Sequence, residues 1–132
     1  MKYIIVAGCG KTGKALAEEL CQENNVVVID RSSQALEELP QDFNGKKIVG
    51  DVLDIETLEK AGIKEADVVV LVTGNDNLNL VVGKFIKRKY SKLKKVILQV
   101  YELNKKKALS EEGLIIINRT YLLVEVFKKC IS

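Results

Sequence analysis

YIIVAGCGKTGKAL, residues 3–16, joins an apolar run to a glycine-rich turn and then to a helix-forming segment. This order predicts a strand, a tight turn and a helix. The start of a helix presents unpaired N–H groups and the positive end of the helix dipole, so a phosphate can bind there if the backbone allows close approach. Glycine allows that approach. We therefore expect a dinucleotide-binding turn made of Gly8, Cys9, Gly10, Lys11, Thr12 and Gly13.

A second apolar run, VVVI at residues 26–29, ends at Asp30 and completes the pattern. An acid about 20 residues after the glycine turn is the usual partner of the adenosine ribose in dinucleotide-binding folds. A carboxylate there accepts hydrogen bonds from the ribose hydroxyls and repels a 2′-phosphate. The spacing therefore favours NAD(H) over NADP(H).

A phosphate loop of the ATPase type is the competing interpretation, because Gly8, Gly13 and Lys14 fit most of its pattern. That pattern requires Ser or Thr after the lysine to hold Mg²⁺. Ala15 stands at this position and has no ligand oxygen. Nucleotide hydrolysis through this loop is therefore disfavoured.

The length of 132 residues predicts a single compact domain over 1–132. The chain has no apolar stretch near the length of a membrane span and no signal-peptide pattern, so we expect a cytoplasmic protein. With three separate cysteines and no histidine, it predicts no metal site and no disulfide framework. Cys9 fits better as a small turn residue than as a redox sensor.

The formal net charge of +3 does not demand a polyanionic partner. Basic residues cluster in two places, but they lack the interleaved aromatic side chains that stack on bases. We therefore expect no nucleic-acid partner. The clusters are Lys84, Lys87, Arg88, Lys89, Lys92, Lys94 and Lys95, then Lys105, Lys106 and Lys107.

Six apolar runs alternate with helical segments along the chain. They predict an α/β fold of the Rossmann type, a doubly wound six-stranded parallel sheet in the order 3-2-1-4-5-6. The strands fall at residues 3–7, 26–30, 46–50, 68–72, 96–100 and 114–117. Helices are expected after Ser32 or Ser33, after Asp54, at 105–111 and at about 121–130. A further helix follows the fourth strand, and its apolar stripe consists of Leu78, Val81, Val82, Phe85 and Ile86.

The last helix, at about 121–130, is apolar around most of its circumference. We expect one face to cover the sheet and a second face to form a subunit interface.

The sequence resembles a known family, the nucleotide-binding lobe of the Trk and Ktr potassium-transport regulatory subunits (TrkA-N), also called the RCK (regulator of potassium conductance) domain. Four motifs carry the resemblance along nearly the whole chain. They are the glycine turn with basic Lys11, Asp30-Arg31 after the second strand, Gly50-Asp51-Val52 after the third, and Thr73-Gly74-Asn75-Asp76-Asn77-Leu78-Asn79 after the fourth. Two positions depart from the family: Gln99 stands for an arginine in strand five, and Arg119 stands for a proline after strand six. Compared with the family, we also expect a single nucleotide-binding domain over 1–132 with no C-terminal lobe.

This resemblance implies a non-catalytic regulatory subunit that binds NAD(H), ATP, ADP or AMP. Asp30 would lie on the ribose, Asp51 near the adenine, and Thr73 and Gly74 near the phosphates or the second nucleoside. Asn79 would be a further cofactor-binding residue. Occupancy would rearrange a homodimer or higher ring, which would gate a potassium transporter or channel in the membrane. The protein would then lie at the inner face of that membrane.

Two alternatives remain open, an NAD-dependent oxidoreductase and a nucleotide-sensing module unrelated to potassium. Tyr-x-x-x-Lys, a catalytic pair in short-chain dehydrogenases, occurs at Tyr90 to Lys94 and at Tyr101 to Lys105. Lysine is abundant here, neither copy lies on a long active-site helix, and the chain has no histidine for proton transfer. These observations favour a binding protein over an enzyme.

Overall fold

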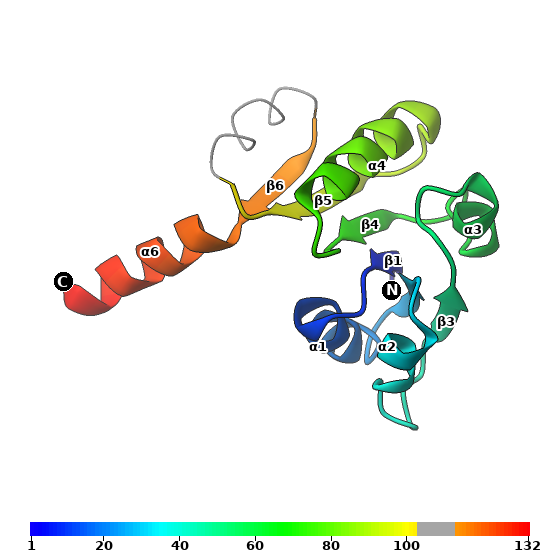
Figure 1. Cartoon of the computed structure of the whole chain (residues 1–132), viewed down its shortest axis with the longest axis horizontal. Coiled ribbons are helices and arrows are strands. Elements are labelled where there is room, and N and C mark those ends of the chain that lie inside the picture. The colour runs from blue at the N-terminus through cyan, green and yellow to red at the C-terminus, as the bar shows by residue number, and fades with distance from the viewer. Residues whose placement is uncertain (103–112) are drawn as a thin grey trace.

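The computed structural model describes residues 1–102 and 113–132, and they form one six-stranded parallel sheet flanked by helices (Figure 1). The strand order is β3-β2-β1-β4-β5-β6, as predicted. The strands are β1 (Tyr3–Ala7), β2 (Asn25–Asp30), β3 (Lys46–Val49), β4 (Val68–Leu71), β5 (Lys95–Val100) and β6 (Ile115–Asn118). The helices are α1 (Lys11–Leu20), α2 (Ser33–Glu37), α3 (Ile55–Lys60), α4 (Asp76–Lys89) and α6 (Arg119–Ile131). The helix expected at 105–111 lies outside the described residues.

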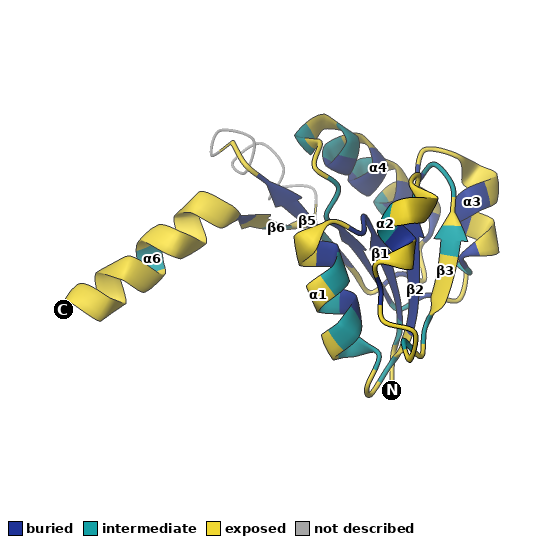
Figure 2. Ribbon diagram, turned by 60° about the horizontal axis from the view of Figure 1, so that its bottom comes forward, coloured by how far each residue is buried: buried dark blue, intermediate teal, exposed yellow. Residues whose placement is uncertain are grey.

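Apolar side chains cover both faces of the central strands and create two separate cores. On one face, Ile4 and Val6 of β1 belong to the same cluster as Ala17 of α1 and Leu36 of α2. The opposite face belongs to α3 and α4, which pack on the alternate residues of the same strands. Burial on two faces explains why strands β1, β2 and β4 are continuous apolar runs, and Figure 2 shows these strands dark blue between the helices.

Polar caps start the helices where the sequence predicts them. The side chain of Ser32 accepts a hydrogen bond from the Ala35 N–H at 3.1 Å, and that of Asp54 accepts one from the Glu56 N–H at 3.1 Å. Helix α3 ends before Gly62, whose φ of +82° suits glycine.

The apolar stripe predicted on α4 is wrong in part. Val82 and Ile86 are buried, whereas Val81 is 57% and Phe85 39% exposed. Gly83 is buried in their place, and a Cβ there would lie 2.9 Å from a methyl group of Leu98. The helix therefore sits close to β5 through its glycine, and this rotates the larger residues outward.

Helix α6 contradicts the expectation that one of its faces covers the sheet. It extends away from the rest of the molecule (Figures 1 and 2), and none of its residues is buried. Its large apolar side chains, from Tyr121 to Ile131, are 47 to 83% exposed. The residues of the sheet beside it, Ile115 and Ile117 of β6, are also partly exposed, since no described helix covers them.

Candidate functional site

A cavity of about 480 Å³ opens at the carboxyl end of the sheet, where β1 and β4 diverge into helices on opposite faces. Each of the six strands supplies or directly precedes a lining residue. The lining residues are Ala7, Gly8, Gly10, Lys11, Thr12, Ile29, Asp30, Arg31, Gly50, Asp51, Val52, Val72, Thr73, Gly74, Leu78, Gln99, Tyr101 and Arg119.

The three glycines of the turn occupy different environments. Gly8 has a φ of +115°, and a Cβ there would lie 2.7 Å from the Val72 carbonyl oxygen. At Gly13 an added Cβ would collide with the carbonyl oxygen of Gly8. Gly10 has no atom within 4 Å of the corresponding position, which opens toward the cavity. Gly8 and Gly13 therefore maintain the fold, whereas Gly10 keeps the entrance to the helix clear.

The amino end of α1 is the feature of this cavity best suited to an anion. Gly10 is its N-cap and makes no side-chain hydrogen bond. Side chains cap the other four described helices, through Ser32, Asp54, Asn75 and Asn118. The first N–H groups of α1 are consequently without a capping side-chain acceptor and lie beside the lining residues Gly10, Lys11 and Thr12. This arrangement favours binding of a phosphate.

Asp30 is held at the end of β2 by backbone donors on both sides. Its Oδ2 accepts a hydrogen bond from the Cys9 N–H at 2.7 Å, and its Oδ1 accepts one from the Ser32 N–H at 2.8 Å. Each carboxylate oxygen retains a further acceptor site. The carboxylate thus connects the glycine turn with the turn after β2 and can still accept from a diol.

Asn79 supports the cavity wall that is formed by the loop after β4 and the end of β5, and it lies behind that wall. It is fully buried, and its Nδ2 donates to the Thr73 carbonyl oxygen at 3.2 Å and to that of Gln99 at 2.9 Å. Its Oδ1 accepts a hydrogen bond from the Thr73 hydroxyl. The network fixes the loop after β4 against β5, with Thr73 and Gln99 at the cavity.

The structure brings eleven of the fourteen expected site residues to the cavity wall, and three lie behind it. Those three are Cys9, Gly13 and Asn79, all of them buried. They support the wall through the contacts described above. Wall residues outside the expected set are Ala7, Ile29, Val72, Leu78, Gln99, Tyr101 and Arg119. Among these residues the sequence had marked Leu78 as part of the fourth family motif, Tyr101 as part of a Tyr-x-x-x-Lys pair, and Gln99 and Arg119 as departures from the family pattern.

Cys9 has the environment of a structural thiol. It is 1% exposed, and its Sγ lies 3.4 Å from the Ala35 carbonyl oxygen, to which it donates. Burial raises the pKa of the thiol, and the carboxylates of Asp30 and Glu38 raise it further. A thiol kept protonated is a poor nucleophile, which agrees with its role as a small residue in the turn.

The two Tyr-x-x-x-Lys copies differ in their surroundings. Tyr90 is buried in the core away from the cavity, and Lys94 pairs with Asp67 at 3.7 Å. Tyr101 lines the cavity, but Lys105 is outside the described residues. In the part of the chain that the structure describes, no group of three His, Cys, Asp or Glu side chains could hold a metal ion. Within the same residues, no helix is long and apolar enough to cross a membrane.

Comparison with known proteins gives a match to the TrkA-N domain family over residues 4–119. The chain belongs to this family. The TrkA-N domain is also 33% identical, over 101 residues, to the Trk system potassium uptake protein TrkA of Streptomyces coelicolor. The aligned part is 76% of this chain and 45% of that protein, so the chain spans less than half of this relative's length.

Solved structures confirm the fold of this TrkA-N domain. The TrkA-N domain of the inner membrane protein YbaL from Escherichia coli superposes with a TM-score of 0.88 at 16% identity, covering 99% of this chain and 97% of that one. The GsuK channel bound to NAD gives a TM-score of 0.80 at 20% identity, covering 97% of this chain and 23% of that one. The family match over residues 4–119 confirms the resemblance inferred from the four motifs.

Proposed function

We propose that this TrkA-N domain is the nucleotide-binding lobe of a non-catalytic regulatory subunit for potassium transport. Its ligand is NAD(H), with ATP, ADP or AMP as the alternatives. The observation that carries the proposal is the uncapped amino end of α1, which lies in one cavity with the backbone-anchored carboxylate of Asp30. The relatives named for potassium uptake supply the biological context.

Each part of an adenine nucleotide has a matching group in the cavity. Asp30 accepts from the ribose hydroxyls, and the phosphates lie on the N–H groups at Gly10, Lys11 and Thr12. Asp51 and Val52, beyond β3, contact the adenine. On the other side, Thr73 and Gly74 face the second phosphate or the second nucleoside.

The exposed α6 supplies the surface for a homodimer or a higher ring. Its large apolar side chains from Leu122 to Ile131 are 48 to 83% exposed, and burial against another copy removes them from water. Occupancy of the cavity changes how the copies pair, and the assembly acts on a potassium transporter or channel at the inner face of the membrane. The coupling free energy between such sites is typically about 1 to 3 kcal/mol, and it requires no chemical reaction of the ligand.

Replacement of Asp30 tests the binding site. Asp30→Ala should weaken NADH binding by about 1 to 3 kcal/mol, because a charge-assisted acceptor is lost. It should also narrow the preference for NADH over NADPH, because the repulsion of the 2′-phosphate disappears. Isothermal titration calorimetry of the nucleotide-free protein measures both effects.

Two further variants make this test specific. Asp30→Asn keeps an acceptor for one of the two backbone donors and should bind NADH with intermediate affinity. Asp42→Ala is the matched control, since Asp42 is exposed and outside the cavity. Unchanged NADH affinity in Asp30→Ala would remove Asp30 from the ribose site.

A further inference from the structure

Arg119 lines the far wall of the cavity next to Gln99 and Tyr101. It is the first residue of α6 and the one residue of that helix, among those described, that reaches the cavity. Its guanidinium has no ion-pair partner within residues 1–102 and 113–132. The cavity therefore contains an available cation at the end opposite Asp30.

The sheet order gives the distance that a ligand must span to touch both residues. Asp30 ends β2 and Arg119 follows β6, and these strands are four places apart. At about 4.8 Å per place the backbones are about 19 Å apart. A ribose on Asp30 puts the first phosphate over α1, beside β1. The extended Arg119 side chain then approaches groups beyond that phosphate, not the phosphate itself.

The start of α6 is fixed to the same wall by Asn118. Its buried Nδ2 donates to the carbonyl oxygens of Val100 and Tyr101, both at 3.2 Å, and its Oδ1 accepts from the Tyr121 N–H at 2.8 Å. The Tyr101 N–H in turn donates to the Asp76 carboxylate at 3.0 Å. Beyond this anchor α6 has no buried residue. The helix is thus attached to the sheet at its amino end, where Asn118 holds β5 and the next residue, Arg119, lines the cavity.

From this geometry we infer that Arg119 binds the second phosphate, or a charged group beyond it, and thereby links occupancy of the cavity to the direction of α6. The inference rests on the proposed function and adds its route of regulation. Ligands with one phosphate fill the Asp30 and α1 part of the cavity and leave Arg119 unengaged. Ligands with two or more phosphates engage it.

A ligand series measured by calorimetry tests the contact. Arg119→Gln should weaken binding of NADH and ADP about tenfold to a hundredfold, since a hydrogen-bonded charge pair is lost. The same variant should leave AMP binding within about twofold. Arg119→Lys keeps the charge and should recover part of the loss. The matched control is Arg31→Gln, a wall arginine beside Asp30, which should not separate AMP from ADP in this way.

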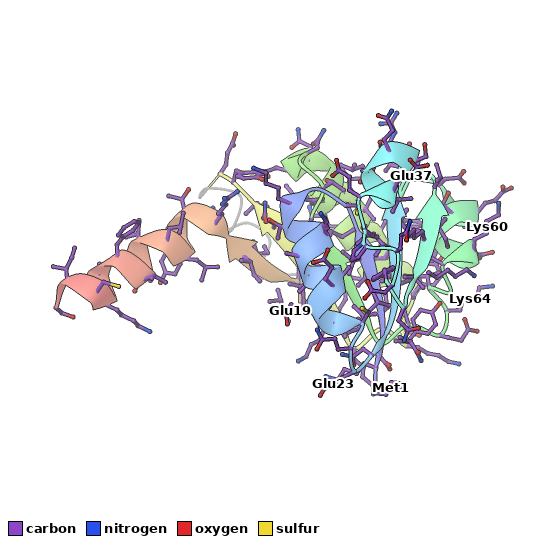
Figure 3. All side chains as sticks on the ribbon, turned by 90° about the horizontal axis from the view of Figure 1, so that it is seen from below. Met1, Glu19, Glu23, Glu37, Lys60 and Lys64 are labelled. Atoms are coloured by element: carbon purple, nitrogen blue, oxygen red, sulfur yellow. The ribbon has the colours of Figure 1, made fainter. Side chains whose placement is uncertain are left out.

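The link to α6 is tested by an electron paramagnetic resonance distance between two spin labels. One label is placed on Cys130, which is exposed on α6, and the other on Glu19→Cys, where Glu19 points away from the body of the molecule (Figure 3). Cys21→Ser removes the half-buried thiol, and Cys9 is buried. Dilution with unlabelled protein restricts the signal to one chain. NADH should shift or narrow the distance distribution, and AMP should not.

The outcomes separate this inference from the proposed function. If Arg119→Gln binds NADH as well as the parent chain does, or if it weakens AMP and NADH equally, the contact is refuted while the nucleotide site stands. If the NADH affinity falls but the label distances do not respond to NADH, the link to α6 is refuted. If the parent chain binds none of the nucleotides, the proposed function fails and this inference fails with it.

Discussion

Gly10 and Gly13 allow the structural and the binding roles of the glycine turn to be separated. Both are replaced by alanine, one at a time. A Cβ on Gly13 meets the Gly8 carbonyl oxygen well inside the 3.0 Å that side chains keep, whereas a Cβ on Gly10 meets nothing within 4 Å. The first change should therefore damage the fold, and the second should leave it intact.

The size of the Gly13→Ala effect follows from what its Cβ meets. Overpacking costs about 1 to 3 kcal/mol when side chains can move, and here the obstacle is backbone, so the cost lies at or above the upper end. Alanine recovers at most about 1 kcal/mol of helix propensity. We expect a net loss of about 2 kcal/mol or more, which is a fall in melting temperature of about 6 to 10 °C for a chain of this size.

Gly10→Ala should cost about 1 kcal/mol or less, because alanine is a poorer N-cap than glycine. Its methyl group enters the cavity at the amino end of α1, so NADH affinity should fall at least tenfold. Urea unfolding and calorimetric titration of the two variants measure stability and binding separately. A Gly10→Ala protein with normal NADH affinity, or a Gly13→Ala protein with normal stability, would refute the division of roles.

Three further predictions concern other parts of the molecule. Asn79→Ala should lower the free energy of unfolding by about 2 to 3 kcal/mol, since the buried Gln99 carbonyl oxygen and the partly buried Thr73 carbonyl oxygen lose their donor. Urea unfolding measures this free energy, and a loss below about 0.5 kcal/mol contradicts the prediction. The free energy of unfolding should fall as the pH rises above about 9, because burial raises the pKa of Cys9, Tyr3 and Tyr90 in the folded state. The unfolded chain then releases these protons at a lower pH than the folded chain does. A free energy of unfolding that is unchanged from about pH 8 to 10.5 contradicts this prediction. In α6, Phe127→Asp should shift the chain from dimer to monomer in sedimentation and light scattering, because Phe127 is 65% exposed on the proposed interface; a parent chain that is monomeric at micromolar concentration refutes the interface.

The fold could be predicted from the sequence because its strongest signals are local. Buried parallel strands require apolar residues on both faces, and the run at Val68–Leu71 has the length and the β-branched residues of such a strand. Asp54 and Gly62 mark the ends of α3 by cap chemistry that depends on a few neighbouring residues. The strand order then follows from the dinucleotide-binding pattern of the glycine turn and Asp30, which is typical of the 3-2-1-4-5-6 topology.

Other features depend on contacts that no local pattern encodes. The position of α4 against β5 is decided by the close approach at Gly83, and this approach turns Val81 and Phe85 to the surface. The direction of α6 depends on Asn118, whose bonds to β5 join residues far apart in the chain. Periodicity describes α6 as apolar but does not say what its apolar faces touch.

The candidate site was predictable where a family motif marks it and unpredictable elsewhere. Gly10 and Asp30 have spacing signatures with a known physical reason. Tyr101 has no spacing signature for nucleotide binding, since its Tyr-x-x-x-Lys pattern points to catalysis, and it reaches the cavity because β5 ends beside β4. Cys9 and Asn79 belong to the motifs, but they lie behind the cavity wall and support it. Their burial and hydrogen-bond partners, which the sequence does not give, show this role.

The central claim, nucleotide binding without catalysis, is tested most directly by calorimetric titration of the nucleotide-free chain with NADH, NAD⁺, NADPH, ATP, ADP and AMP. An absorbance record at the NADH band follows any turnover in the same samples. We predict saturable binding of NADH or an adenine nucleotide, weaker binding of NADPH and no change in the NADH absorbance. Absence of binding by all six, or steady oxidation of NADH, would contradict the account.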